Sequence, residues 1–231
     1  MSRATGDLLS YFDAKDVEGS PPRPSWNVAP TQDVPIITEK LHEDELDRRL
    51  LIARWGLVPS WAKDTKIGSR LINARSETIL EKPSFRKAAI TRRALIPAEG
   101  YYEWQKTEDG KKIPNYLYSE TEKLLAFAGL YELWPDPSLP EDDPGKWLLS
   151  CTVLTTTAQD TLGHVHDRAP VIIPPEMFAD WLDPDTRDKD KVQELLDCVP
   201  DPVLTPRIVG DRVNSVRNNG PELVEPVKEN S

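Results

Sequence analysis

Apolar and polar residues alternate with a period of two in many short runs of the chain, which is the pattern of half-buried β-strands. In the clearest run, Tyr101, Glu103 and Gln105 fall on one side and Tyr102 and Trp104 on the other. The alternation and the apolar runs predict strands over residues 34–37, 50–55, 94–97, 99–104, 115–118, 124–133, 147–155 and 169–173. Because proline cannot donate a ladder hydrogen bond, the proline in residues 34–37 makes that run an edge strand.

Helical spacing is shorter and rarer than the strand pattern. Leu8, Leu9 and Phe12 share one face of a helix over residues 5–12, with Thr5 as its N-cap. Further helices are predicted over residues 83–89, 175–181 and 189–196.

Turn and loop signals separate these elements. Asp109-Gly110 predicts a tight hairpin, and clustered prolines predict exposed loops at residues 21–24 and 134–145. From Asn219 onward the sequence is polar, so we expect a frayed tail, counted as residues 221–231.

Many short strands with a few helices, irregularly ordered, indicate the α+β class. We expect one domain over residues 1–231, built around a mixed, barrel-like β-sheet with short peripheral helices. A chain of 231 residues buries enough surface for a sizeable core.

The charge of the chain is unevenly distributed. The whole chain has a formal net charge of −10, but residues 51–98 contain ten bases and three acids, or +7, which leaves −17 elsewhere. A basic segment on an acidic body would guide a polyanion to one place. The alternative is ordinary solvated charge.

Composition excludes several classes of protein. No apolar run approaches the roughly 20 residues of a membrane helix, and no signal sequence opens the chain, so we expect a soluble cytoplasmic protein. Cys151 and Cys198 cannot form a disulfide framework, and three histidines are too few for a Cys/His zinc cluster. Neither a metal nor a cofactor is expected.

Glu103 is a candidate general acid-base, because a carboxyl group among aromatic rings loses hydration and its pKa rises. The alternative is an exposed glutamate on a strand. His164 and His166 share a face if they lie on a strand, which suits a metal or proton transfer. A third ligand for a metal is missing, and a structural role is the remaining alternative. Both cysteines could be nucleophiles, but their apolar neighbours favour core positions.

Tryptophan and arginine are interleaved in the basic segment, from Arg54 through Trp61 to Arg75. This mixture is typical of surfaces where single-stranded bases stack and phosphates pair. Asn73 could hold a sugar or a base by paired hydrogen bonds.

Five segments in this order resemble the SOS response-associated peptidase family of abasic-site-processing proteins. They are Asn27-Val28-Ala29-Pro30, Arg54 to Trp61, Asn73 to Thr78, Pro97 to Trp104 and His164 to Pro170, and the resemblance runs from about Thr5 to Val227.

The resemblance implies a barrel-like α+β fold and recognition of abasic sites in single-stranded DNA. It also implies a covalent crosslink, in which the amine of an N-terminal Cys condenses with the sugar aldehyde and its thiol closes a thiazolidine. By motif match, Asn73 would hold the sugar, Glu103 would transfer protons and His166 would assist ring opening. The DNA strand would lie on Arg75, Trp61, Arg54, Arg70 and Arg86.

One position departs from the family pattern, since Met1-Ser2-Arg3-Ala4 stands where the family begins Met-Cys-Gly-Arg. We expect a start that falls several residues late, so that residues 1–4 are a truncated beginning and the nucleophile is absent. In the other explanation Ser2 replaces the cysteine, and its hydroxyl closes a weaker, more reversible ring.

The leading hypothesis is therefore a DNA-damage protein of the SOS response, a monomer that associates with the nucleoid when bound to DNA. Its activity would be crosslinking of abasic sites or lyase-like processing. Two alternatives remain open. One is a module that binds single-stranded DNA without covalent chemistry, and the other is a thiol peptidase or hydrolase with autoproteolytic activity.

Overall fold

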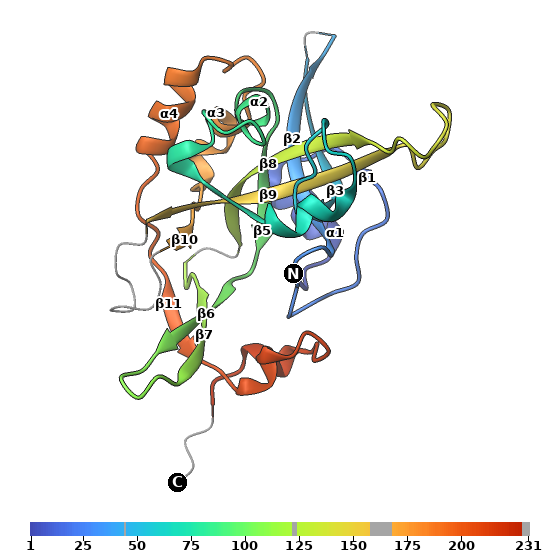
Figure 1. The fold of residues 1–231 in the computed structure, drawn as a ribbon. Coiled ribbons are helices and arrows are strands. Elements are labelled where there is room, and N and C mark those ends of the chain that lie inside the picture. Colours follow the sequence, from blue (N-terminus) through green and yellow to red (C-terminus); the bar gives the residue numbers. More distant parts are fainter. Residues whose placement is uncertain (44, 122–123, 158–167, 228–231) are drawn as a thin grey trace.

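The computed structural model describes residues 1–43, 45–121, 124–157 and 168–227. They form an eight-stranded sheet and a three-stranded sheet (Figure 1). The larger sheet contains the strands β1 (Val17–Glu18), β2 (Asp33–His42), β3 (Glu45–Trp55), β4 (Asn73–Arg75), β5 (Arg93–Ala98), β8 (Leu125–Pro135), β9 (Trp147–Thr157) and β10 (Arg168–Pro170).

Five strands of the larger sheet close into a barrel in the order β3-β2-β5-β8-β9. The closing contact is a short parallel pairing in which Arg54 and Trp55 of β3 lie opposite Ser150 and Cys151 of β9. The other barrel neighbours pair antiparallel, so the barrel is mixed. The α+β, barrel-like prediction is confirmed.

Alternate residues of the barrel strands pack on opposite sides, as a period of two requires. Ile36 and Ala53 belong to a cluster inside the barrel. Ile37 and Leu50 belong to a second cluster outside it, which the helices complete. Both sides of the barrel wall are therefore apolar, and the sequences of these strands contain continuous hydrophobic runs.

Short helices cover the outer cluster. They are α1 (Thr5–Phe12), α2 (Arg86–Thr91), α3 (Phe178–Leu182) and α4 (Lys189–Asp197), and short 3₁₀ helices are η1 (Thr65–Arg70), η2 (Ser76–Thr78) and η3 (Pro175–Met177). In α1, Leu8 and Phe12 lie one turn apart and are buried against the barrel.

Arg93 fixes α3 to the barrel. Its guanidinium donates to the carbonyl oxygens of Trp181, Asp183, Thr186 and Ala89, at 2.6 to 3.1 Å. It also lies 5.7 Å from the centre of the Trp181 ring. Burial lowers the pKa of Arg93 to about 10, which leaves the group charged at neutral pH.

The smaller sheet lies beyond one end of the barrel (Figure 1). It has the order β11-β7-β6 and contains β6 (Tyr101–Lys106), β7 (Lys112–Tyr118) and β11 (Thr205–Ile208). The turn between β6 and β7 contains Asp109 and Gly110, and Gly110 has a φ of 82°. The predicted hairpin is confirmed.

Three local predictions are wrong. β2 pairs with both β3 and β5, so it is an interior strand and not an edge, despite Pro35. The N-cap of α1 is Ala4 without a side-chain hydrogen bond, and not Thr5.

The expected frayed tail is also wrong for most of its length. After β11 the chain forms η4 (Asp211–Asn214) and η5 (Pro221–Val224), and Leu223 is 2% exposed. Asn219 accepts hydrogen bonds from the backbone of Trp26 and the hydroxyl of Ser25. Residues 211–224, called the C-terminal wall below, therefore pack on the body of the protein.

Candidate functional site

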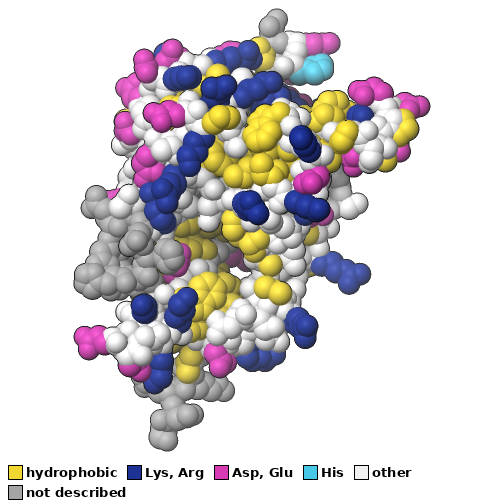
Figure 2. All heavy atoms as spheres, viewed as in Figure 1, with side chains coloured by type: hydrophobic (Ala, Val, Ile, Leu, Met, Phe, Trp, Pro, Cys, Tyr) yellow, Lys and Arg dark blue, Asp and Glu magenta, His cyan; other side chains and the backbone are white. Residues whose placement is uncertain are grey.

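A cavity of about 400 Å³ lies between the open end of the barrel and the smaller sheet. Val34, Ile96 and Val153 belong both to its lining and to the barrel interior. Figure 2 shows the surface hollowed between these two parts, with hydrophobic side chains bordering the hollow. Aromatic side chains supply much of the remaining lining, namely Trp26, Trp55, Tyr101, Tyr102, Trp104, Tyr116 and Phe127.

Glu99 and Gly100 connect β5 to β6 at the cavity. A β-carbon on Gly100 would lie 2.5 Å from the carbonyl oxygen of Leu117 and 2.6 Å from the hydroxyl of Tyr116. Only glycine allows this approach, which brings the phenol close to the connection. Burial, and then the charge of Glu99, raise the pKa of Tyr116, so its phenol stays neutral.

The amino end of the chain lies at the same place. The backbone N–H of Ser2 donates to Oε2 of Glu99 at 2.6 Å, and the Ser2 hydroxyl lies 2.8 Å from both carboxylate oxygens. Arg3 adds an ion pair to Glu99 at 3.4 Å. Glu99 is thus the carboxylate that faces residues 2 and 3.

Met1 lines the cavity, and its amino group donates to the carbonyl oxygen of Ser25. Burial lowers the pKa of this amino group below its ordinary value of 8.0, and the charge of Glu99 acts in the opposite direction. A lowered pKa increases the fraction of neutral amine, which is the nucleophilic form.

The aromatic lining is held by hydrogen bonds to two other segments. The hydroxyl of Tyr102 donates to the carbonyl oxygen of Trp26 at 2.7 Å, and the indole of Trp104 donates to Oδ1 of Asn214 at 2.7 Å. The rings of Tyr102 and Tyr116 lie 5.3 Å apart. Burial raises the pKa of Tyr102 to about 12, so this phenol is also neutral.

Asn27 attaches the C-terminal wall to the cavity. Its side-chain amide donates to the carbonyl oxygens of Val213, Ser215 and Asn218 at 3.1, 3.2 and 3.3 Å. Asn27 is 9% exposed. Because its amide donates to several carbonyl oxygens, Asn27 holds in place a segment whose regular structure is limited to short 3₁₀ turns.

Glu103 lies within β6, whereas Glu99 precedes this strand. It is half-buried and opposite Asn115 of β7, and its charge raises the pKa of Tyr101 after the larger effect of burial. It is not among the described residues that line the cavity, whereas Glu99 is. Sequence reasoning missed Glu99. The available signal was a carboxylate followed by glycine directly after a buried strand.

Asn73 and Arg75 lie on β4, and both are exposed. Because β4 pairs with β9, Asn73 lies opposite Val153, which lines the cavity. The Asn73 motif is therefore one strand away from the cavity.

Glu77 joins two of the segments singled out in the sequence. Arg168 donates from both terminal nitrogens to its two carboxylate oxygens, at 2.6 and 2.8 Å. This bidentate pair lowers the pKa of Glu77 to about 2, chiefly through the hydrogen bond from Arg168. The Asn73-to-Thr78 segment and the start of β10 are thus fixed to each other. His164 and His166 lie outside the described residues.

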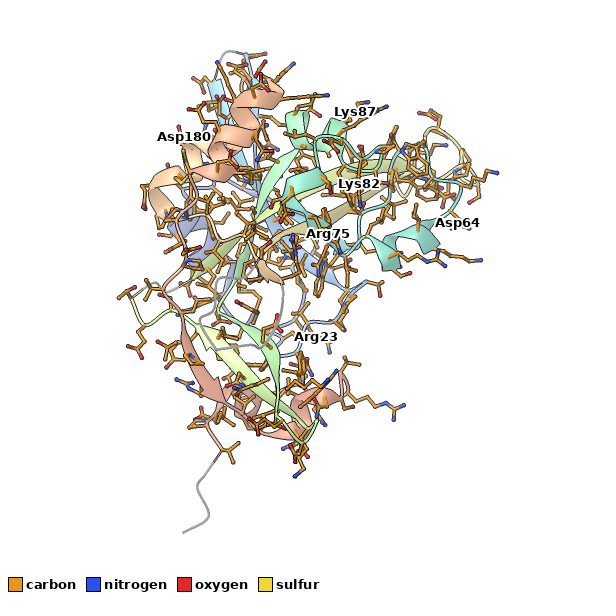
Figure 3. The ribbon with its side chains drawn as sticks, turned by 60° about the vertical axis from the view of Figure 1, so that its left-hand side comes forward. Arg23, Asp64, Arg75, Lys82, Lys87 and Asp180 are labelled. Atoms are coloured by element: carbon orange, nitrogen blue, oxygen red, sulfur yellow. The ribbon has the colours of Figure 1, made fainter. Side chains whose placement is uncertain are left out.

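Most bases of the predicted basic segment are exposed. Seven of its ten bases are exposed, namely Lys63, Lys66, Arg70, Arg75, Lys82, Arg86 and Lys87. In the view of Figure 3, Arg75 lies near the middle of the molecule with Lys82 and Lys87 above it and Arg23 below. Trp61 is 58% exposed, as stacking on a base requires.

Three of the ten bases are not exposed. Arg54 is half-buried. Arg92 pairs with Glu132 at 3.3 Å, and Arg93 is 5% exposed beneath α3. The last two hold the scaffold together, so the charge that a strand could meet is smaller than the sequence indicated.

The cysteines differ from each other. Cys151 is buried in β9, as predicted, and burial raises the pKa of its thiol. Cys198 is exposed at the end of α4, so its predicted core position is wrong.

No helix in the part of the chain that the structure describes is long and apolar enough to cross a membrane. No group of three or more His, Cys, Asp or Glu side chains in the same part could hold a metal ion.

The fold is a closed mixed barrel with an aromatic cavity at one end. Met1, at the amino end of the chain, lines this cavity. The SOS response associated peptidase (SRAP) family model matches residues 1–216, and the chain belongs to this family.

Several known proteins are similar to it. "Abasic site processing protein YoqW" of Bacillus subtilis is 44% identical over 202 residues, 87% of this chain and 86% of that protein. "Abasic site processing protein HMCES" of Gallus gallus is 30% identical over 233 residues, 89% of this chain and 67% of that protein. A crystal structure from Bacteroides thetaiotaomicron superposes with a TM-score of 0.67 at 29% identity, covering 85% of this chain and 82% of that one.

Proposed function

We propose that this protein processes abasic sites in single-stranded DNA by capturing the aldehyde of the ring-opened sugar on an amine at the amino end of the chain. The observation that carries the proposal is that Met1 lines the cavity and that the next residue, Ser2, contacts Glu99 of the same lining. The names of the relatives support the choice of an abasic site as the substrate.

An aldehyde and a neutral amine condense to an imine and water, and burial favours the neutral amine of Met1. Without Met1, the amine would belong to residue 2. The Ser2 hydroxyl could then add to the imine carbon and close a five-membered ring. Because this ring reopens more readily than a thiazolidine, we expect a reversible adduct.

The DNA strand would follow the exposed bases of residues 63–87. Arg75, Arg70 and Arg86 are exposed, and Trp61 offers a ring for base stacking. Asn73 as the sugar-binding residue, and Glu103 and His166 as proton-transfer residues, stay predictions of the resemblance. Arg54 is half-buried at the barrel closure, and its DNA contact is likewise a prediction.

The test incubates the chain with a single-stranded oligonucleotide that contains one abasic site, with and without cyanoborohydride, which reduces an imine to a stable amine. A shifted band on a denaturing gel is the expected result, and it should be stronger with the reductant. The control oligonucleotide contains a tetrahydrofuran abasic analogue, which has no aldehyde and must give no shifted band. A second control is the chain with its α-amine acetylated.

The exposed bases and Trp61 also favour a second candidate, a module that binds single-stranded DNA without covalent chemistry. In that case the tetrahydrofuran and the true abasic oligonucleotides bind equally tightly and neither is captured. Failure of both capture and binding would contradict both candidates.

A further inference from the structure

Glu77 lies where three strands of the larger sheet meet. It belongs to η2, directly after β4, and its carboxylate accepts hydrogen bonds from the last residue of β9 and the first residue of β10. The bond from the Thr157 hydroxyl is 3.5 Å long, and the two bonds from Arg168 are 2.6 and 2.8 Å long. One carboxylate therefore contacts the ends of two strands that are distant from it in sequence.

Arg168 extends this contact across β9. One of its terminal nitrogens also donates to the carbonyl oxygen and to the hydroxyl of Thr155. Thr155 lies opposite Arg75 of β4 and opposite Pro170 of β10, so these two strands flank β9 at the same residue. The contacts join β4, β9 and β10 at one point. They are called the clasp below, and its members are Glu77, Thr155, Thr157 and Arg168.

β4 depends on such contacts for its position. It has three residues and, among the described strands, pairs only with β9, so it makes few ladder hydrogen bonds. The exposed side chains of Asn73 and Arg75 share one side of β4, because alternate residues of a strand point the same way. Asn73 lies opposite Val153, which lines the cavity. The clasp therefore fixes an exposed amide and an exposed guanidinium one strand away from the cavity.

We infer that Glu77 is a positioning residue that acts through Arg168 to hold Asn73 and Arg75 in the orientation that binds the DNA strand during capture. The inference rests on the proposed function, because it names a determinant of DNA binding for that reaction. Glu77 need not touch the DNA, since both of its carboxylate oxygens accept hydrogen bonds from Arg168.

The sign of the effect separates positioning from simple electrostatics. A carboxylate that is 46% exposed and two residues from Arg75 repels phosphate groups. If Glu77 acted only through its charge, its removal would strengthen DNA binding. If it positions β4, its removal weakens DNA binding although the chain becomes less negative.

The experiment measures capture of the abasic oligonucleotide in cyanoborohydride at a series of oligonucleotide concentrations. Glu77→Gln keeps the shape of the side chain but turns one of its two acceptor oxygens into an N–H group that faces Arg168. We expect the half-saturating concentration to rise about tenfold, the effect of losing one charge-assisted hydrogen bond, with the maximal rate within about twofold. Binding of the tetrahydrofuran oligonucleotide, measured by fluorescence anisotropy, should weaken by the same factor.

Glu18→Gln is the matched control. Glu18 of β1 accepts from Arg49 at 2.8 Å and is 59% exposed, so the substitution removes the same charge from a comparable ion pair. We expect the half-saturating concentration to change by less than about twofold. A loss as large as that of Glu77→Gln would show that any broken ion pair has this effect and would contradict the inference.

A small aldehyde distinguishes positioning of the DNA from damage to the cavity. Free 2-deoxyribose offers an aldehyde without phosphates or bases, so its reductive addition to the amino end does not require a bound strand. Mass spectrometry of the N-terminal peptide should give a rate within about twofold of the unsubstituted rate for Glu77→Gln. An equal loss with deoxyribose and with DNA would assign Glu77 to the stability of the cavity and overturn the inference.

The route through Arg168 is tested by a double substitution. In a chain that carries Arg168→Met, adding Glu77→Gln should change the half-saturating concentration by less than about twofold, because residues that act through one shared contact are not additive. A full additional loss would mean that Glu77 acts without Arg168 and would contradict the inference.

Failure of the inference differs from failure of the proposed function. If the unsubstituted chain captures no DNA, the proposed function fails, and binding of the tetrahydrofuran oligonucleotide still decides the role of Glu77. If the unsubstituted chain captures DNA and Glu77→Gln does so at an equal or lower half-saturating concentration, the inference is overturned.

Discussion

Replacing Asn27 with aspartate tests how the C-terminal wall is held. The substitution preserves the shape of the side chain but removes the N–H groups that donate to the carbonyl oxygens of Val213, Ser215 and Asn218. It also places a carboxylate against three carbonyl oxygens at a position that is 9% exposed.

We expect Asn27→Asp to lower the free energy of unfolding by about 3 kcal/mol at neutral pH. An uncompensated buried charge destabilises a protein by about 3–5 kcal/mol, and the lower end of this range applies because the wall lies at the surface. In a chain of this size 3 kcal/mol corresponds to a fall in melting temperature of about 6–12 °C if the protein unfolds as a unit. If only residues 211–224 detach, hydrogen exchange of their amides should instead accelerate by about 100-fold.

The cost should depend on pH in one direction. Burial disfavours the charged form, so the folded-state pKa of the new carboxyl group lies above its unfolded value of about 3.9. Stability is therefore recovered as the pH falls through the folded-state pKa, where the protonated acid donates one hydrogen bond.

Asn219→Asp is the matched control for Asn27→Asp. Asn219 uses its side-chain oxygen as an acceptor from Trp26 and Ser25, which a carboxylate also provides. Its amide donates only one long bond, to the carbonyl oxygen of Pro24 at 3.4 Å, and the residue is exposed. We expect a change within about 0.5 kcal/mol. Equal effects of the two substitutions on melting temperature and on exchange would refute the assignment of Asn27 as the donor that holds the wall.

The remaining predictions concern the scaffold and the DNA surface. Arg93→Met should lower the free energy of unfolding by about 3 kcal/mol in denaturant titration, because it leaves four carbonyl groups without their donor. Glu77→Gln should cost about 1 kcal/mol above pH 4.5, discounted because Glu77 is 46% exposed, and the difference should vanish as the pH falls toward 2, where the native carboxyl group is also protonated. Arg75→Ala should reduce the salt dependence of DNA binding by about one unit of slope. Trp61→Ala should weaken binding by about 1–3 kcal/mol at an unchanged slope.

Each of the first three predictions has a contradicting result. A neutral Arg93→Met would mean that water replaces the guanidinium, and a Glu77→Gln penalty that persists at pH 2 would mean that the ion pair is not its source. Salt slopes that do not respond to Arg75→Ala would remove that residue from the DNA surface.

Much of the fold could be predicted because periodicity and proline positions are local signals. Residues 5–12 form the expected helix, and the Asp109-Gly110 turn joins the expected strands. Pro35 misled the prediction of strand position, since one missing N–H does not stop β2 from pairing on both sides. β11 was not predicted at all, because its four residues become a strand only by pairing with β7.

The site was harder to predict for a physical reason. Glu103 had the stronger local signal, three aromatic neighbours in sequence. Those neighbours, Tyr101, Tyr102 and Trp104, line the cavity and Glu103 does not, so the alternation along β6 does not predict which side chains reach the cavity. Glu99 became a candidate only through its contact with Ser2, 97 positions away in sequence. Long-range packing also removed a candidate. Arg93 was counted in the basic segment, but it is buried beneath α3, which begins 85 residues later.

The central claim is tested most directly by locating the covalent bond. After capture of the abasic oligonucleotide, reduction and digestion with nuclease and trypsin, mass spectrometry should find the added sugar fragment on the peptide that contains Met1 or Ser2. A modification on a surface lysine such as Lys63 or Lys82, with the amino end unmodified, would contradict the account.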